Sequence, residues 1–133
     1  MHKNFKGIEK TVFGRGSFGQ LGGIVEEQRK SPNDFMLYLV DAYFKGHELE
    51  KRIPAKTQDI VRFIDVDPYE PTTDQIDEIR DTTLQQKGLP AAVIGIGGGS
   101  IMDIAKAVSL MFTNEGPSKN YQGLNLILSL IHI

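Results

Sequence analysis

The sequence contains no cysteine among its 133 residues. A disulfide framework, a zinc–thiolate site and a cysteine nucleophile are therefore excluded, and the absence fits a cytoplasmic protein. No stretch approaches the roughly 18 consecutive apolar residues of a membrane span, and the segment Met1 to Lys6 lacks the apolar run of a signal peptide. We therefore expect a soluble, cytoplasmic protein without a membrane partner.

The chain also lacks a strong charge of one sign. It carries 15 Lys and Arg residues against 17 Asp and Glu residues, a net charge of -2. The basic residues are scattered along the chain, so the electrostatic footprint of a nucleic-acid-binding protein is missing. The length corresponds to about one domain with a marginal core, and we expect small-molecule rather than nucleic-acid partners.

Histidine is scarce as well. The only histidines are His2, His47 and His132, and none has a second histidine or a carboxylate at metal-binding spacing. The chain by itself is therefore predicted to hold no catalytic metal. His47 lies in a polar segment, and we expect it to be a surface residue rather than a base or a ligand.

What the sequence does have is a glycine-rich turn between a strand and a helix. The apolar run Ala91 to Gly95 predicts a strand that is buried on both faces. Gly97, Gly98 and Gly99 follow, and each costs about 0.5 to 1 kcal/mol relative to alanine in regular structure, which indicates positive φ angles or a ligand against the main chain. Apolar residues then recur at helical spacing, at positions 101, 104, 105, 108 and 111. A helix start with free N–H groups favours a phosphate or pyrophosphate.

Two polar residues after the glycines have two possible roles. Ser100, followed three residues later by Asp103, is also the pattern of a capping box, and Asp103 with Lys106 is a possible i,i+3 ion pair. Capping would explain both side chains without a ligand. It would not explain three tandem glycines, so contact with an anionic ligand is the alternative for both residues.

An acidic residue ends the clearest strand of the sequence. Phe35 to Val40 is apolar throughout, and Asp41 follows at its carboxyl end. Ligands of open parallel sheets bind at this end of the strands, where a carboxylate can accept hydrogen bonds from ribose hydroxyls and repel a 2′-phosphate. The alternative is a helix cap or a solvated turn residue. Because Asp41 precedes the glycines, this is not the usual order of the dinucleotide fingerprint.

The remaining elements alternate between strands and helices. In the first half of the chain we expect a strand over 11–13, a helix capped by Ser17, the strand ending at Asp41 and a weak helix over 42–52. In the second half we expect a strand over 60–66 and then a helix that is capped by Thr72 and Gln75 and ends near Gly88. The strand before Gly97 and the helix after Gly99 complete the order. This alternation predicts an α/β fold, a Rossmann-like parallel sheet with helices on both faces.

The glycine turn and the residues after it resemble a family signature. The run Gly97-Gly98-Gly99-Ser100-Ile101-Met102-Asp103-Ile104-Ala105-Lys106 is similar to GGGS-x-x-D-x-AK, the signature of the iron-containing (group III) alcohol dehydrogenases. Further matches lie at residues 13–18, 39–41 and 70–74. Within this family the chain most resembles the 3-deoxy-manno-octulosonate 8-oxidases, through residues 4–6, 28–30, 52–54 and 121–123. The resemblance extends to about Ile127.

This resemblance implies a function and a set of roles. Family members transfer a hydride between an alcohol or aldehyde and a nicotinamide, here NAD rather than NADP, and use a divalent metal (Fe or Zn) held by one Asp and three His of a helical C-terminal domain. Asp41 would take the adenosine ribose, the amides of Gly97 to Gly99 the pyrophosphate, and Ser100 one phosphate oxygen. Asp103 would cap the helix or face the nicotinamide and the substrate. The substrate would be an alcohol or a sugar acid. The finer resemblance implies oxidation of the 8-hydroxyl of 3-deoxy-manno-octulosonate, a sugar of lipopolysaccharide. The resemblance also implies that the protein is a homodimer.

The chain is accordingly interpreted as part of a longer enzyme. Residues 1–127 are predicted to form a truncated N-terminal dinucleotide-binding domain, inactive by itself. Residues 128–133 read like a transposase-adapter sequence translated in frame, so we expect this tail to be an artefact, with a genuine apolar tail as the alternative. A stand-alone nucleotide-binding or interaction module without catalysis is the alternative function.

Overall fold

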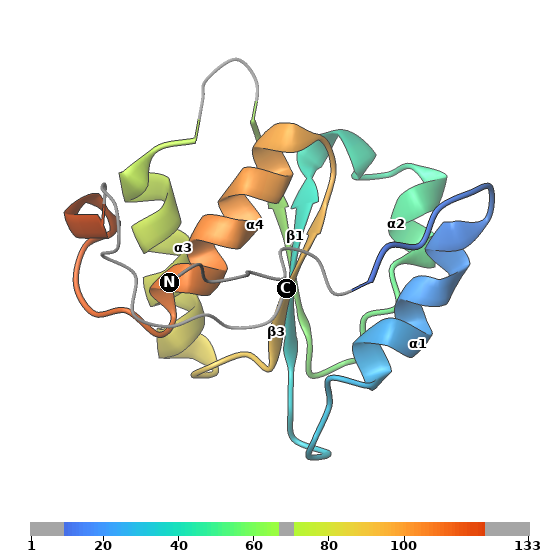
Figure 1. Cartoon of the computed structure of the whole chain (residues 1–133), viewed down its shortest axis with the longest axis horizontal. Coiled ribbons are helices and arrows are strands. Elements are labelled where there is room, and N and C mark those ends of the chain that lie inside the picture. Colours follow the sequence, from blue (N-terminus) through green and yellow to red (C-terminus); the bar gives the residue numbers. More distant parts are fainter. Residues whose placement is uncertain (1–9, 67–70, 122–133) are drawn as a thin grey trace, which may run out of the picture.

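The computed structural model describes residues 10–66 and 71–121, which form three layers (Figure 1). The strands are β1 (Met36–Asp41), β2 (Ile60–Ile64) and β3 (Ala92–Ile96). The α-helices are α1 (Leu21–Glu26), α2 (Glu48–Arg52), α3 (Thr73–Gln86) and α4 (Gly99–Met111), and short 3-10 helices are η1 (Ser17–Gln20), η2 (Ala42–Phe44) and η3 (Ser118–Tyr121). Helices α3 and α4 cover one face of the sheet, while α1 and α2 lie on the other (Figure 1). The predicted α/β fold with helices on both faces is confirmed.

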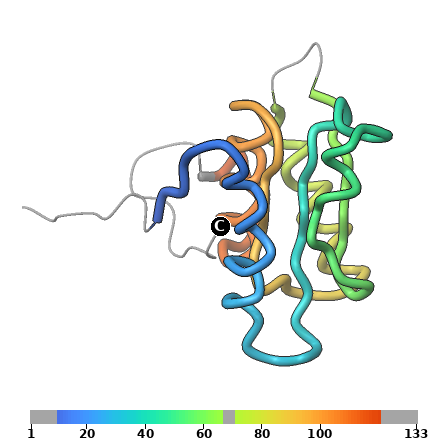
Figure 2. The backbone as a smooth tube through the Cα atoms, turned by 90° about the vertical axis from the view of Figure 1, so that its right-hand side faces the viewer, coloured from blue at the N-terminus to red at the C-terminus, as the bar shows by residue number. Residues whose placement is uncertain are grey.

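The sheet is parallel with the strand order β2-β1-β3. In the register, Val40 of β1 lies beside Phe63 of β2 and Ile96 of β3, so all three strands end at the same edge. Figure 2 shows β1, in cyan, running from the loop after α1 at one end of the molecule to η2 at the other. We call these two ends the amino edge and the carboxyl edge of the sheet.

The central strand β1 separates two apolar clusters. Leu37 and Leu39 pack with side chains of α3 and α4, whereas Met36, Tyr38 and Val40 pack with residues around α1, η2 and α2. These five side chains are fully buried, which follows from the alternation of side chains along a strand that is covered on both faces. The apolar run in the sequence therefore predicted this strand correctly.

Helix α4 packs so closely on β3 that Gly95 has no room for a side chain. A Cβ added at Gly95 would lie 2.8 Å from the Cβ of Ala105 and 3.5 Å from the carbonyl oxygen of Ile101. We expect Gly95→Ala to lower the free energy of unfolding by about 1 to 3 kcal/mol, because the helix must move away from the sheet. Urea unfolding followed by circular dichroism measures this loss. Gly23→Ala is the control, because an added Cβ there meets nothing within 4 Å, and an equal loss in both variants would contradict the prediction.

Helix α3 starts and ends as predicted. The backbone N–H of Gln75 donates to Oγ1 of Thr72 at 3.2 Å, which is the N-cap half of the expected capping box. At the other end Gly88 has a φ of 89° and its N–H donates to the carbonyl of Leu84 at 3.1 Å. Both signals are local in sequence, which explains why they could be read without the tertiary structure.

Two predictions for the first described segment are wrong. Residues 11–13 form no strand, and Ser17 does not cap a helix with its side chain. Gly16, with a φ of 78°, stands at the cap position, and Ser17 is the first residue of η1. The apolar face predicted for this helix is confirmed in part, because Val25 is buried and Phe18 and Leu21 pack on the same cluster.

A charged network joins segments that are distant in sequence at the amino edge. Arg29 donates through Nη1 to Oδ1 of Asp59 at 2.8 Å and through Nη2 to Oδ2 at 2.5 Å. The backbone N–H groups of Met36 and Lys56 donate to the same carboxylate, each at 2.8 Å. The side chain of Asp59 is 0% exposed and that of Arg29 is 6% exposed. This network ties the loop after α1 to the starts of β1 and β2.

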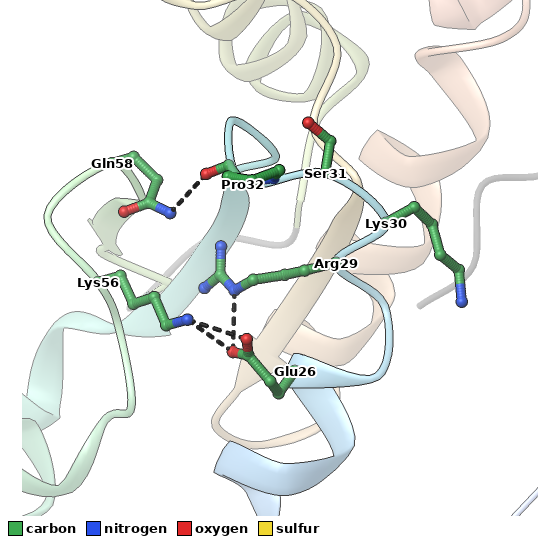
Figure 3. Close-up of a pocket in the computed structure, with 7 residues that line it drawn as sticks. All are labelled: Glu26, Arg29, Lys30, Ser31, Pro32, Lys56 and Gln58. Carbon is green, nitrogen blue, oxygen red and sulfur yellow. Dashed lines mark hydrogen bonds and ion pairs between the residues drawn. The ribbon is translucent and has the colours of Figure 1, made fainter.

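Glu26 extends this network toward the surface. Its Oε2 lies 2.8 Å from Nζ of Lys56 and 3.3 Å from Nε of Arg29 (Figure 3). The contact from Arg29 Nε lacks hydrogen-bond geometry and is an ion pair only. The hydrogen bond from Lys56, together with the positive charges of Lys56 and Arg29, holds the pKa of Glu26 below its ordinary value. Because Glu26 is exposed, its contribution to stability is small compared with that of Asp59.

Candidate functional site

The carboxyl edge of the sheet brings Asp41 and the glycine turn together. A Cβ added at Gly97 would lie 3.0 Å from the Cβ of Asp41 and 2.9 Å from Cγ1 of Ile101. Gly97 also has a φ of 155°, a conformation that residues with side chains rarely adopt. Gly97 is therefore required by the fold, because the turn passes between the end of β1 and the first turn of α4.

Gly98 and Gly99 are different from Gly97. Gly98 has a φ of −80° and a ψ of −169°, which any residue can adopt, and a Cβ added at Gly98 or at Gly99 meets nothing within 4 Å. Both residues are exposed. Of the two explanations that the sequence left open, a positive φ angle therefore applies to Gly97 only, and a ligand against the main chain stays the prediction for Gly98 and Gly99. Nothing in residues 10–66 and 71–121 explains the absence of side chains at these two positions, where the main chain is open to close approach from solvent.

The first turn of α4 has hydrogen-bond donors to offer at this open surface. Gly98 is the N-cap residue, and its carbonyl accepts from the N–H of Met102 at 3.1 Å. Within residues 10–66 and 71–121, the N–H groups of Gly99, Ser100 and Ile101 donate no hydrogen bond. These free donors and the positive end of the helix dipole suit an anion such as a diphosphate.

The capping alternative for Ser100 and Asp103 is wrong. No side chain caps α4, because Gly98 is the cap residue and Ser100 already lies at the second helical position. In the described part of the chain no ion pair joins Asp103 to Lys106, and all three side chains are exposed. Their exposure at the start of α4 leaves ligand contacts open to Ser100 and Asp103, and those contacts stay predictions.

Of the two roles that the sequence left open for Asp41, the structure shows the cap, and the ribose contact stays a prediction. Oδ1 of Asp41 accepts a hydrogen bond from the backbone N–H of Tyr43 at 3.0 Å, so the side chain caps η2. Among the described residues no donor reaches Oδ2, and the side chain is partly exposed. A ribose hydroxyl can therefore donate to Oδ2 without displacing the cap, which is the arrangement a ribose acceptor needs.

Sequence reasoning missed an aromatic pair beside this site. Tyr43 is 68% exposed, and its ring stacks on that of His47 at a centroid distance of 4.8 Å. The only available signal was an aromatic residue two positions after the acid that ends β1. His47 itself is exposed, as predicted.

The described residues contain neither a metal cluster nor a membrane-spanning helix. No group of three or more His, Cys, Asp and Glu side chains in residues 10–66 and 71–121 is placed to hold a metal ion. No helix in the same segments is long and apolar enough to cross a membrane.

Comparison with known proteins identifies the class that this fold and site define. The sequence model of the protein family described as iron-containing alcohol dehydrogenase matches residues 9–132 of this chain. The chain therefore belongs to the iron-containing alcohol dehydrogenase family.

Particular relatives agree with this assignment. The NAD-dependent methanol dehydrogenase of Bacillus methanolicus is 30% identical over 123 residues, which cover 88% of this chain and 30% of the relative. The sulfoacetaldehyde reductase of Bilophila wadsworthia (strain 3_1_6) is 43% identical over 53 residues, covering 39% of this chain and 14% of the relative. The finer resemblance to 3-deoxy-manno-octulosonate 8-oxidases is not confirmed, because these relatives are named for other substrates.

A solved structure shares the fold. The sulfoacetaldehyde reductase from Bifidobacterium kashiwanohense, crystallised in complex with NAD+, matches with a TM-score of 0.66 and 21% identity, over 84% of this chain and 29% of that protein. The chain thus spans less than a third of the length of the relatives that it matches.

Proposed function

We propose that this chain is the NAD-binding part of an alcohol dehydrogenase of the iron-containing family. The observation that carries the proposal is the pair Gly98 and Gly99. Their missing side chains leave free amides open to solvent, although no contact among the described residues requires glycine there. A relative that is NAD-dependent and a fold neighbour crystallised with NAD+ support the choice of ligand. When bound, NAD would supply the nicotinamide that accepts or donates the hydride.

Each residue of the site has a role in holding this ligand. The amides at the start of α4 bind the diphosphate, and Gly97 lets the turn pass close to Asp41. Oδ2 of Asp41 accepts from a ribose hydroxyl. Ser100 reaches one phosphate oxygen, and Asp103, one turn further along α4, faces the nicotinamide and substrate side because its charge would repel the phosphates.

We expect Asp41→Asn to weaken NAD binding about tenfold and to reduce the discrimination against NADP. The variant loses a charge-assisted hydrogen bond to the ribose and the repulsion of a 2′-phosphate. Isothermal titration calorimetry with NAD+ and NADP+ measures both dissociation constants. Glu27→Gln is the control, since it removes the same charge from an exposed position at the C-cap of α1. If Asp41→Asn and the control bind both nucleotides like the parent chain, Asp41 has no part in selecting the cofactor.

Substrate and catalysis belong to the longer protein of which we propose this chain is part. Two substrate classes follow from the sequence and its relatives: the terminal hydroxyl of 3-deoxy-manno-octulosonate, and small alcohols or aldehydes such as those in the relatives' names. The described residues do not fit the metal of the family, so we assign it no ligand and no step here. NADH formation or consumption by the longer gene product, measured with each substrate, would separate the two classes, while the chain alone is expected to bind NAD without turnover. The cytoplasmic location and the homodimer stay predictions.

A further inference from the structure

A second hollow lies at the amino edge of the sheet, at the end opposite to the glycine turn. Glu26, Arg29 and Lys56 are among the residues that line it, and Figure 3 shows the three side chains converging. The hollow is open to solvent and has a volume of about 430 Å³. This volume is in the range of sites that bind small molecules. We call it the amino-edge hollow.

The guanidinium of Arg29 has two edges that can each bind an oxyanion. Nη1 and Nη2 form one edge, which the carboxylate of Asp59 occupies. Nε and the second N–H of Nη2 form the other edge, because the five N–H donors of arginine have a fixed planar arrangement. Nε is buried, and no acceptor among the described residues takes a hydrogen bond from it. Since a buried donor without an acceptor costs free energy, the second edge of Arg29 is suited to an external oxyanion.

Glu26 lies where such an anion would bind. Its Oε1 and Oε2 are 3.0 Å and 2.8 Å from Nζ of Lys56. Oε2 is also 3.3 Å from Nε of Arg29, but without hydrogen-bond geometry. The carboxylate therefore satisfies the lysine and not the arginine. Because the Glu26 side chain is 57% exposed, it can turn into solvent without leaving a packed core.

We infer that the second edge of Arg29 and the ammonium of Lys56 bind a tetrahedral oxyanion such as phosphate, for which Glu26 is an internal competitor. One phosphate can accept from Nε and Nη2 side by side and from the ammonium at the same time. When Glu26 turns away, Arg29 and Lys56 present two positive charges, of which the buried carboxylate of Asp59 balances one. The inference does not depend on NAD binding, because the amino-edge hollow and the glycine turn lie at opposite ends of the strands.

The competing explanation is an ordinary surface network, in which Glu26 only links α1 to the loop before β2. Exposed ion pairs of this kind add little to stability and bind nothing. The two explanations differ in the effect of Glu26→Gln on phosphate affinity. Removal of a competitor raises the fraction of molecules that can bind, and therefore the affinity, whereas removal of a network partner does not.

The test titrates sodium phosphate and sodium sulfate into the isotope-labelled full chain, with sodium chloride at equal ionic strength as the reference. NMR follows the Nε–H of Arg29 and the backbone N–H groups of Gly99 and Ile101, which report on the two ends of the sheet separately. We expect a saturable shift of the Arg29 signal with phosphate and sulfate but not with chloride. Glu26→Gln should strengthen phosphate binding about fivefold, and Lys56→Gln should weaken it about tenfold.

Glu48→Gln and Lys51→Gln are the matched controls. They break another Lys–Glu pair, which lies on α2 with Nζ and Oε1 3.3 Å apart and with both side chains exposed. Each control changes the net charge as its counterpart does, and each should bind phosphate within about twofold of the parent. Circular dichroism checks that all four variants are folded.

A further titration with glycerol 3-phosphate distinguishes the two sources of a phosphate group. Tighter binding of glycerol 3-phosphate than of inorganic phosphate would assign the hollow to a phosphorylated small molecule, and the reverse order would assign it to the free ion. Either order agrees with the inference.

Three results would overturn the inference. The first is the lack of a saturable shift at Nε of Arg29, and the second is a shift confined to the N–H groups of α4. The third is phosphate binding by Glu26→Gln that is no tighter than by Glu48→Gln, which would leave Glu26 as part of a surface network only. None of these results contradicts the proposed function, which is tested separately with NAD+.

Discussion

Gly98→Val is expected to weaken NAD binding at least about a hundredfold while the variant unfolds at the same urea concentration as the parent chain. Gly98 has a φ of −80° and a ψ of −169°, which suit valine, and a Cβ at this position meets no atom of the described residues within 4 Å. Bound diphosphate would have to approach the main chain where the new side chain stands, and the loss of two hydrogen bonds to a charged group amounts to about 3 kcal/mol or more. Calorimetry with NAD+ measures the binding, and urea unfolding measures the stability.

Gly23→Val is the matched control for this experiment. Gly23 lies in α1, where a Cβ also meets nothing within 4 Å, but it is remote in sequence from the glycine turn. This variant should keep the NAD affinity of the parent. Undiminished binding by Gly98→Val would show that the diphosphate does not rest on these amides, and a large loss of stability would show that Gly98 serves the fold after all.

Asp59→Ala is expected to lower the free energy of unfolding by about 3 to 5 kcal/mol. The substitution leaves the guanidinium of Arg29, which is 6% exposed, without its carboxylate, and it also removes the acceptor of two backbone N–H groups. Removing one partner of a buried ion pair costs this much because the other charge stays buried, and the remaining ion pair of Arg29 with the exposed Glu26 offsets little of the loss. Glu78→Gln is the control, since its ion pair with Arg62 lies at the surface with 53% of the Glu78 side chain exposed, and it should cost less than about 1 kcal/mol.

The same carboxylate makes the stability of the chain depend on pH. Burial by itself would raise the pKa of Asp59, but hydrogen bonds from Arg29 and from the backbone N–H groups of Lys56 and Met36 hold the pKa below its ordinary value. A carboxyl group with a lowered pKa in the folded state stabilises the protein above its ordinary pKa of about 4, and this contribution disappears as the pH falls through the lower folded value. Urea unfolding at pH 7 and pH 3 should therefore show a smaller difference for Asp59→Ala than for the parent. If the stability of the variant and that of the parent change by the same amount between pH 7 and pH 3, groups other than Asp59 cause the acid sensitivity.

Several parts of the fold could be read from the sequence because their causes are local. The strand β1 needs only an uninterrupted apolar run, and α3 only a threonine cap at one end and a glycine at the other. The order of motifs then implied a parallel sheet, whose strands must end at a common edge. The structure places Asp41 and Gly97 side by side at this edge.

Other features could not be read because their partners lie far apart in the chain. Arg29 and Asp59 are separated by 30 positions, so the network at the amino edge follows only from the way the loops pack. Ser17 is an acceptable cap residue, yet the left-handed Gly16 takes the cap position in the fold. The stack of Tyr43 and His47 depends on the turn that η2 makes after β1, which has no distinct sequence pattern.

By itself the sequence determined the class of fold, the family and the place where an anionic ligand is expected, because apolar periodicity and glycine content act over a few residues. Only the tertiary structure decided which glycine serves which purpose. Gly97 is pressed between Asp41 and Ile101, whereas Gly98 and Gly99 face solvent. The three residues are chemically identical and adjacent, so the difference between them depends entirely on what the rest of the chain places beside each one.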